Sequence, residues 1–320
     1  MMKGVFVNWT KPYVERKRLR GHAFSVYRAQ ESDIYMTTDQ EILFTILSVG
    51  YWKKFNGPTK LFTDKTGFDY YRKNGMLRLW DEIDVHTLEN YDYVDAGQFW
   101  TSGKSYAIGK QEGPFVFLDL DFIVRQKLPD WVFNSKITIP YWEIPRGYYY
   151  PTEEQYSQIK HWKPKDGYSY KMLIPNTSFL YINDSNVQKE YLEEHMKAVN
   201  TKDEVPEWFW LVTDQGLFGQ SLRNNNVNPQ TLTDRVFLAD TEYIESEVGR
   251  ADPFFYMLSH DKSKEELNWD HVWFRKIVYN YDESERVKDC RKFYKEIEDF
   301  LPEYIDMIQR DRLLKYKDFY

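Results

Sequence analysis

Apolar segments and helix signals alternate along the first 120 residues of the chain. Residues 4–9 form an apolar run bounded by polar residues, and Thr38 with Glu41 forms a capping box that opens a helix. Residues 60–63 are an expected next strand, and residues 114–118 (PFVFL) are the clearest strand of all. Strands that alternate with helices form a sheet covered on both faces. The pattern therefore predicts an α/β fold with a central sheet flanked by helices.

Beyond residue 125 the pattern becomes mixed. Residues 136–142 and 178–182 are expected strands, and residues 187–199 are an expected surface helix. From Val287 onward, apolar residues fall at spacings of three and four, which predicts a helical tail. We therefore expect a mixed central sheet within one domain over residues 1–265. Residues 266–320 are expected to form a helical C-terminal extension packed on that domain.

Composition excludes several classes of protein. Aromatic residues make up 18% of the chain, which is far from the composition of a disordered protein. The net charge of -7 makes nucleic acid an unexpected partner. No stretch approaches the roughly 20 uncharged residues of a membrane span, and no signal peptide is recognisable. Because the single Cys290 excludes a disulfide framework, we expect a cytoplasmic protein.

Two carboxylates, Asp119 and Asp121, directly follow the clearest strand. In open α/β sheets, ligands bind outside the carboxyl ends of the strands. Two carboxylates this close stay ionised together only when a cation lies beside them. Mg²⁺ and Mn²⁺ take oxygen ligands and keep open positions for phosphates, so we expect one of these ions here. The alternative is that one acid caps a turn while the other is solvated.

This Asp-x-Asp strand, after an N-terminal half of strands and helices, resembles the nucleotide-sugar glycosyltransferases of the GT-A fold, in particular families 8 and 32. Residues 61–64 (LFTD) are similar to the strand end that binds the nucleoside in these enzymes. Residues 99–104 (FWTSGK) are similar to the aromatic helix whose Lys precedes the Asp-x-Asp strand. Residues 175–183 are similar to their Asn-small-Gly strand, except that Ser178 replaces the Gly.

Two later segments extend the resemblance to about residue 265. Asp214 and Gln215 are similar to the acidic helix start beside the donor sugar. Residues 258–264 are similar to the late segment in which a His completes the metal site and a Lys meets the diphosphate. The resemblance implies a metal site of Asp119, Asp121 and His260, a donor site of Thr63, Asp64, Lys104, Asp119, Asn176, Lys262 and Lys264, and Asp214 as the catalytic residue.

Aromatic residues follow the expected strand at residues 136–142. The C–H faces of sugars stack on such rings, so we expect Trp142, Tyr148 and Tyr149 to bind the acceptor. The edge of an aromatic core explains these residues equally well. At the C-terminus, Arg310, Arg312, Lys315 and Lys317 alternate with apolar residues. This pattern fits either a helix that caps the domain or a peripheral contact with the inner face of a membrane.

These features and the resemblance together predict a metal-dependent glycosyltransferase of the hexosyltransferase type. The expected donor is a nucleotide-diphosphate sugar, by default a UDP-sugar, and the expected acceptor is a glycan, a glycolipid or a protein. One alternative is a phosphohydrolase of the haloacid dehalogenase type, in which Asp119 would be the nucleophile. That motif has Thr or Val two residues after its second Asp, where this chain has Ile123. The other alternative is a non-catalytic carbohydrate-binding protein, which would explain the aromatics without needing the two acids.

Overall fold

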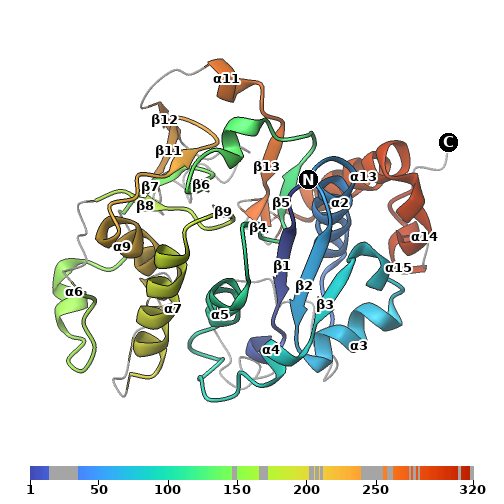
Figure 1. Cartoon of the computed structure of the whole chain (residues 1–320). Coiled ribbons are helices and arrows are strands. Elements are labelled where there is room, and N and C mark those ends of the chain that lie inside the picture. Colours follow the sequence, from blue (N-terminus) through green and yellow to red (C-terminus); the bar gives the residue numbers. More distant parts are fainter. Residues whose placement is uncertain are drawn as a thin grey trace. The chain divides into compact units, whose positions relative to one another are not determined.

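The chain is represented by a computed structural model (Figure 1). It describes residues 1–13, 35–145, 150–165, 172–201, 205, 209, 212–238, 255–257, 262–273, 275–276, 279, 282–308 and 311–317. The contacts divide the chain into two compact units. The first unit consists of Met1–Glu89, Leu118–Leu128 and Asn268–Tyr320, and the second unit consists of Asn90–Phe117 and Pro129–Leu267.

A mostly parallel sheet of seven strands, flanked by helices, confirms the expected α/β class. Its strand order is β10-β6-β9-β4-β1-β2-β3. Strand β1 is parallel to β2, β2 to β3, and β10 to β6, whereas β9 is antiparallel to β6 and makes the sheet mixed. The strands are β1 (Gly4–Asn8), β2 (Thr59–Thr63), β3 (Glu82–Asp84), β4 (Phe115–Leu118), β6 (Ile137–Ile139), β9 (Phe179–Ile182) and β10 (Gln230–Thr231).

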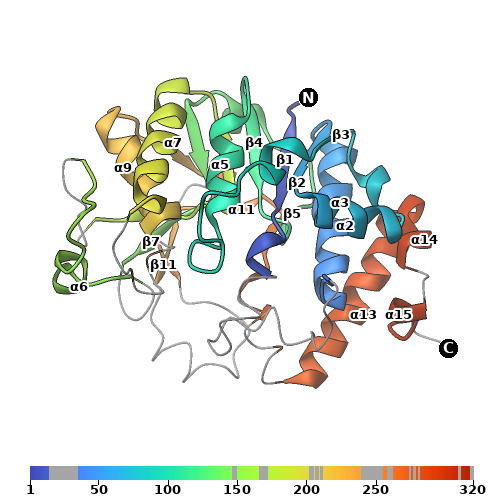
Figure 2. The same ribbon diagram turned by 90° about the horizontal axis from the view of Figure 1, so that it is seen from below.

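In the first unit, helix α2 (Asp39–Phe55) begins at the predicted capping box. The Thr38 side chain accepts from the Glu41 backbone, and the Glu41 carboxylate accepts from the Thr38 backbone at 2.9 Å. Helix α13 (Glu283–Phe300) packs against α2, with the rings of Phe44 and Phe293 5.1 Å apart (Figure 2). Between residues 64 and 90 this unit also contains the helices α3 (Lys65–Lys73), η2 (Leu77–Leu79) and α4 (His86–Glu89).

The segment expected to be a helical extension begins with a strand. Strand β13 (Trp269–His271) pairs antiparallel with β5 (Phe122–Val124), so that His271 lies opposite Phe122. The rings of Trp269 and Phe122 stack 5.1 Å apart, and the Val272 amide donates to the Asp121 carbonyl at 3.1 Å. The residues after 267 therefore belong to the first unit and return the chain to the turn that carries the acid pair.

The second unit contains a separate four-stranded sheet with the order β12-β11-β7-β8. The single strand expected at residues 136–142 is divided between the two sheets, into β6 and β7 (Trp142–Ile144). The division falls at Pro140, which has no N–H to donate to a strand ladder. The other elements are η3 (Asp130–Phe133), α5 (Ser102–Lys110), α6 (Glu153–Ser157), β8 (Ile174–Pro175), α7 (Ser185–Val199), η5 (Val212–Gly216), α9 (Leu217–Asn224), β11 (Arg235–Leu238), β12 (Phe255–Met257) and α11 (Lys262–Glu265).

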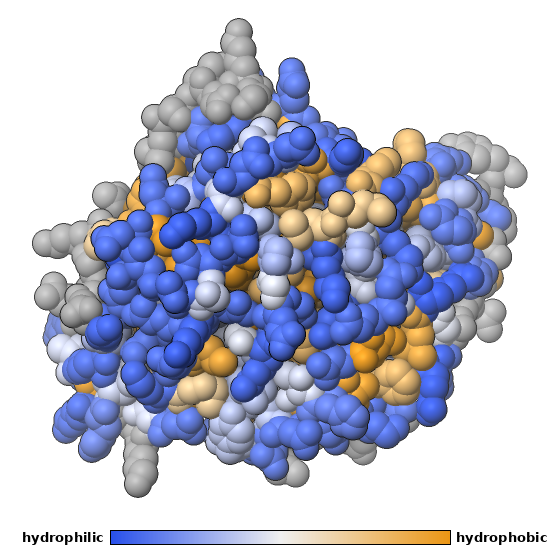
Figure 3. Space-filling view, in the orientation of Figure 1, coloured by the Kyte–Doolittle hydropathy of each residue, from blue (hydrophilic) through white to orange (hydrophobic). Residues whose placement is uncertain are grey.

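The last part of the chain forms three short helices, η6 (Pro302–Tyr304), α14 (Ile305–Ile308) and α15 (Asp311–Leu314). The Lys315 ammonium lies 2.7 Å from the Asp39 carboxylate at the start of α2, and the Tyr316 hydroxyl donates to the same group at 2.9 Å. Among the described residues, no helix is both long and apolar enough to cross a bilayer. Hydrophilic residues cover most of the face seen in Figure 3. The predicted membrane contact stays a prediction, and its Arg310 lies outside the described residues.

Candidate functional site

The Asp119–Asp121 turn follows β4 and is fixed by hydrogen bonds within the first unit. The Phe122 amide donates to the Asp119 carbonyl at 3.0 Å, which closes the turn. The buried Ser48 hydroxyl of α2 donates to the Phe122 carbonyl at 2.6 Å. The turn is therefore held against a helix whose own start is set by a capping box.

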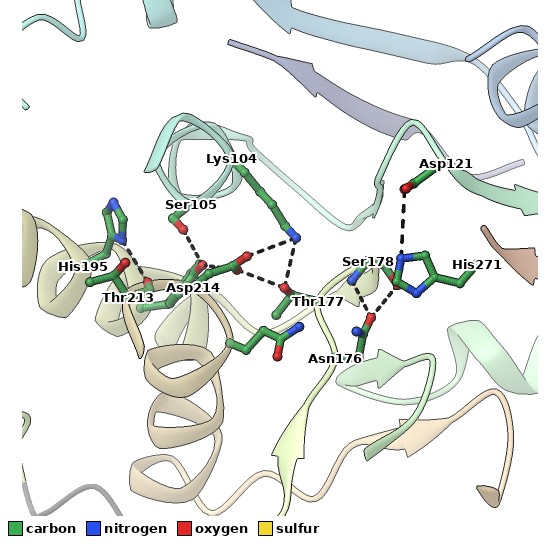
Figure 4. A network of polar contacts seen from close by, with 12 residues as sticks. Lys104, Ser105, Asp121, Asn176, Thr177, Ser178, His195, Thr213, Asp214 and His271 are labelled. Atoms are coloured by element: carbon green, nitrogen blue, oxygen red, sulfur yellow. Dashed lines mark hydrogen bonds and ion pairs between the residues drawn. The ribbon is translucent and has the colours of Figure 1, made fainter. Parts of the chain in front are cut away.

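The pairing of β13 with β5 brings His271 beside this turn. One ligand atom each from Asp119, Asp121 and His271 lie within 4.8 Å of one another. Figure 4 shows the Asp121–His271 contact, in which Oδ1 and Nε2 are 4.0 Å apart. Two carboxylate oxygens and an imidazole nitrogen suit Mn²⁺, and the oxygens also suit Mg²⁺. The predicted acid pair thus belongs to a group that could hold a metal. His260, the predicted third ligand, lies outside the described residues.

Lys276 provides a positive charge at the same turn. Its Nζ lies 2.8 Å from Oδ2 of Asp121 and 4.0 Å from Oε1 of Glu41. Burial alone would raise the pKa of Asp121, but the Lys276 ammonium and then His271 outweigh burial and hold this pKa below its usual value. Burial acts to lower the pKa of Lys276, yet Asp121 and Glu41 raise it. Both side chains are therefore charged and form an ion pair at the turn.

The predicted nucleoside-binding residues join the carboxyl ends of β1 and β2. The Asp64 carboxylate caps α3 by accepting from the Gly67 amide at 2.9 Å. It also accepts from the backbone and the hydroxyl of Thr10, both at 2.7 Å. The Thr63 hydroxyl donates to the Asn8 carbonyl at 2.7 Å. Asp64 and Thr63 therefore shape this edge of the sheet, where parallel strands present ligand sites. Their contact with a donor stays a prediction.

In the second unit, Lys104 and Asp214 form a buried ion pair. Nζ lies 3.3 Å from Oδ2, and the two side chains are 13% and 4% exposed. Thr177 bridges them, since its hydroxyl accepts from Lys104 at 3.0 Å and donates to Asp214 at 2.9 Å (Figure 4). The Tyr191 hydroxyl lies 3.2 Å from Asp214 Oδ1. Asp214 stands in the π-helical turn η5, an irregularity that is frequent at functional sites.

His195 supports that turn from α7. Its Nδ1 lies 3.0 Å from the Thr213 carbonyl, and its Nε2 lies 2.7 Å from the Ser102 hydroxyl. Burial lowers the pKa of His195 to about 4, despite the opposing effects of the Thr213 carbonyl and Asp214. The neutral ring donates from Nδ1 and accepts at Nε2, which fixes the backbone just before Asp214.

We expect acid to destabilise the fold through His195. The pKa rises from about 4 in the folded chain to about 6.5 on unfolding, so the unfolded chain binds more protons between these values. Stability therefore falls as the pH falls through this window, by about 2 kcal/mol at pH 5 relative to pH 8. Denaturant titrations across this pH range should show that the unfolding free energy of His195→Gln lacks this decrease toward low pH. His161→Gln, at an exposed position, should keep it, and equal slopes in all three proteins would contradict the assignment.

Asn176 is held by neighbouring side chains. Its Nδ2 donates to Oε1 of buried Glu143 at 2.6 Å, and its Oδ1 accepts from the Ser178 amide at 2.9 Å and the Ser178 hydroxyl at 2.5 Å. Ser178, which stands where the resembled families have Gly, thus orients the amide. Burial raises the pKa of Glu143, even though hydrogen bonds from Tyr150 and Asn176 lower it. The role of Asn176 toward a donor sugar stays a prediction.

The other predicted site residues lie elsewhere or outside the described residues. Lys264 pairs with Asp234 at 2.6 Å and donates to the Thr231 hydroxyl at 3.1 Å. Trp142 stands in β7 and lines a pocket beside those residues. The side chain of Lys262 is not described, and Tyr148 and Tyr149 lie outside the described residues.

Sequence reasoning missed His271, Lys276, Thr177 and His195. For the first two a signal existed, because His271 is followed by Lys276, the same order of residue types that favoured residues 258–264. The pairing of β13 with β5 places His271 at the turn. No local signal identifies Thr177 or His195, which act through contacts between distant segments.

Comparison with known proteins gives structural likenesses alone. No family model matches the sequence, and no curated protein matches it. Mouse xyloside xylosyltransferase 1 in its apo form is 10% identical, with a TM-score of 0.42 over 81% of this chain and 95% of that chain. The PaToxG glycosyltransferase is 10% identical, with a TM-score of 0.39 over 70% and 68%. A nucleoside-diphosphate-sugar pyrophosphorylase from Vibrio cholerae RC9 is 12% identical, with a TM-score of 0.36 over 74% and 93%. At these values the likeness carries no functional assignment.

Proposed function

We propose that this chain is a metal-dependent glycosyltransferase that uses a nucleotide-diphosphate sugar as its donor. The observation that carries the proposal is the group of Asp119, Asp121 and His271, with the Lys276 ammonium beside it. Carboxylates and an imidazole would hold Mn²⁺ or Mg²⁺, ions that keep open positions for phosphate oxygens. A divalent ion and the Lys276 ammonium together would suit the negative charge of a diphosphate. A UDP-sugar is our default donor.

The proposed chemistry is the departure of a diphosphate from a sugar. Negative charge develops on the phosphate oxygens as the glycosidic bond breaks, and a bound divalent ion would stabilise that charge as a Lewis acid. The Lys276 ammonium would stabilise the same charge electrostatically. The Ser48 hydrogen bond keeps the acid pair in place before the donor arrives, which reduces the reorganisation needed during the reaction.

We assign recognition of the sugar to the network of Lys104, Thr177 and Asp214. It offers an ammonium, a hydroxyl and a carboxylate, which are suitable partners for sugar hydroxyls. Asp214 is our proposed catalytic residue, which either orients the sugar or acts as a base. The acceptor in this proposal is a glycan, a glycolipid or a protein.

A thermal-shift panel tests the donor and the metal together. We expect one of UDP, GDP, CMP or their sugars to raise the melting temperature with Mn²⁺ or Mg²⁺, and the rise to vanish with EDTA. A ligand at 100 times its Kd stabilises the folded state by about 2.7 kcal/mol, which is readily measured. Absence of stabilisation by every nucleotide with both metals would contradict the proposed function.

The phosphohydrolase alternative gives a different outcome in a separate assay. The protein is incubated with Mg²⁺ and p-nitrophenyl phosphate and is then digested for mass spectrometry. We expect no phosphate on Asp119, because in our proposal its carboxylate holds the metal. An aspartyl-phosphate at Asp119 would replace the transferase proposal with the phosphohydrolase.

A further inference from the structure

A small pocket lies in the second unit beside β7, next to the turn between β10 and β11. Its volume is about 200 Å³, and its walls include Trp142, Asn228, Thr231, Asp234 and Arg235. Drug-sized ligands occupy pockets of about 300–1,000 Å³, so this pocket fits a ligand no larger than about one sugar ring. The described residues that line it belong to a single unit, so its walls do not depend on how the units are placed.

The pocket walls combine an aromatic face with hydrogen-bonding groups. Trp142 is half-buried and lines the pocket, and Asn228 and Arg235 are exposed. An aromatic ring offers a face on which the C–H groups of a sugar can stack. Carboxylate, amide, hydroxyl and guanidinium groups can donate to and accept from sugar hydroxyls. This mixture fits a saccharide better than a purely apolar ligand.

Lys264 holds one wall of the pocket in place. Its ammonium pairs with Asp234 at 2.6 Å, and the two side chains are 18% and 10% exposed. It also donates to Thr231 at 3.1 Å, which joins the turn before β11 to β10. A wall that is already ordered loses less entropy when a ligand binds. Lys264 thus orders one wall of this pocket, in addition to the diphosphate contact predicted from sequence.

Strand β7 separates this pocket from the network that contains Asn176. Successive side chains of a strand point to opposite faces, so Trp142 and Glu143 face opposite ways. Glu143 bonds to Asn176 and lies near Lys104 and Asp214, whereas Trp142 lines the pocket. A sugar in the pocket is therefore a different sugar from one held by the Lys104–Asp214 network.

We propose that the Trp142 pocket binds one sugar ring of a glycan acceptor, at a distance from the ring that receives the transferred sugar. This inference rests on the proposed function. It narrows the proposed acceptor from a glycan, a glycolipid or a protein to a molecule that contains an oligosaccharide. A single ring on one aromatic face gives weak binding, with a Kd on the order of 1 mM.

The test measures binding of simple saccharides to the full chain without nucleotide or metal. The probes are methyl glycosides of glucose, galactose, mannose and N-acetylglucosamine, together with lactose and cellobiose. Saturation-transfer NMR and tryptophan fluorescence should detect binding of at least one probe at millimolar concentration. We expect Trp142→Leu to weaken that binding at least tenfold, and Asp234→Asn to weaken it about fivefold by loosening the wall held by Lys264.

The matched control is Asp299→Asn, which removes an exposed surface ion pair with Lys295 in the other unit and should leave binding unchanged. Circular dichroism checks that each variant is folded, and Asp234→Asn serves as the test if Trp142→Leu does not fold. No binding of any probe, or equal binding by wild type and both pocket variants, would overturn the inference.

The outcomes separate this inference from the proposed function. If nucleotide and metal stabilise the protein but no saccharide binds, only the inference about the pocket is overturned. If saccharides bind to the wild type but not to Trp142→Leu, and no nucleotide stabilises the protein, the inference about the pocket holds and the transferase proposal is contradicted. The chain would then fit a carbohydrate-binding protein.

Discussion

Replacement of Asp121 by Asn is expected to lower kcat/KM for donor turnover by on the order of a thousandfold. The substitution keeps the shape of the side chain but removes a charged ligand atom from the Asp119–Asp121–His271 group. It also leaves Lys276 without the carboxylate that lies 2.8 Å from its ammonium. Metal stabilisation of a developing charge is worth several kcal/mol, and each 1.36 kcal/mol is a factor of ten in rate. Steady-state turnover of the donor identified by thermal shift measures the loss.

Asp69→Asn is the matched control for this prediction. Asp69 also accepts from basic side chains in the first unit, Lys65 at 2.7 Å and Arg72 at 2.8 Å, but its side chain is 39% exposed and it is remote from the acid turn in sequence. Surface pairs of this kind contribute about 0–1 kcal/mol, so turnover should stay within a factor of two. Full activity in Asp121→Asn would remove the metal role that we assign to the turn.

Local signals in the sequence predict the elements around the acid pair well. The capping box at Thr38 and Glu41 predicts the start of α2, because both partners of the interaction lie within four residues. The apolar run before Asp119 predicts β4, since a buried strand needs only its own residues to be apolar. The acid pair at the end of this strand then follows from the general position of ligand sites in α/β sheets.

The third member of the metal group depends on a pairing between distant segments. His271 reaches Asp121 because β13 pairs with β5, and their register places His271 opposite Phe122. A strand of three residues carries almost no periodic signal, so the sequence pattern cannot distinguish it from a loop. The order of a His followed by a Lys fits both His260 and His271, and only tertiary pairing brings His271 to the turn.

The buried ion pair of the second unit also depends on a contact between distant segments that local sequence signals do not predict. The family resemblance predicts Lys104 and Asp214 as separate site residues and gives no reason to expect that they touch. Their contact requires α5 and the π-turn η5 to approach each other, and it is completed by the hydroxyl of Thr177. Long-range polar contacts of this kind leave no spacing rule in a sequence.

Replacement of Lys104 by Met is expected to destabilise the second unit by about 3 kcal/mol, because it leaves the buried Asp214 charge without its ion-pair partner. The remaining donors, Thr177 and Tyr191, offset only part of that loss. Denaturant unfolding followed by tryptophan fluorescence measures the change. Lys295→Met is the control, since the Lys295 side chain is 62% exposed and its replacement should cost less than about 0.5 kcal/mol.

The double variant Lys104→Met with Asp214→Asn decides whether the pair is the cause. Removal of one partner strands a buried charge, whereas removal of both charges leaves none to desolvate, so the double variant should be more stable than the sum of the two single losses predicts. We expect a coupling energy of at least about 1.5 kcal/mol. Additive losses would show that Lys104 stabilises the fold independently of Asp214, through its contact with the Phe117 ring, whose centroid lies 5.1 Å from the ammonium. The recovered double variant should still lack transfer activity, because in our proposal the same two charges hold the sugar.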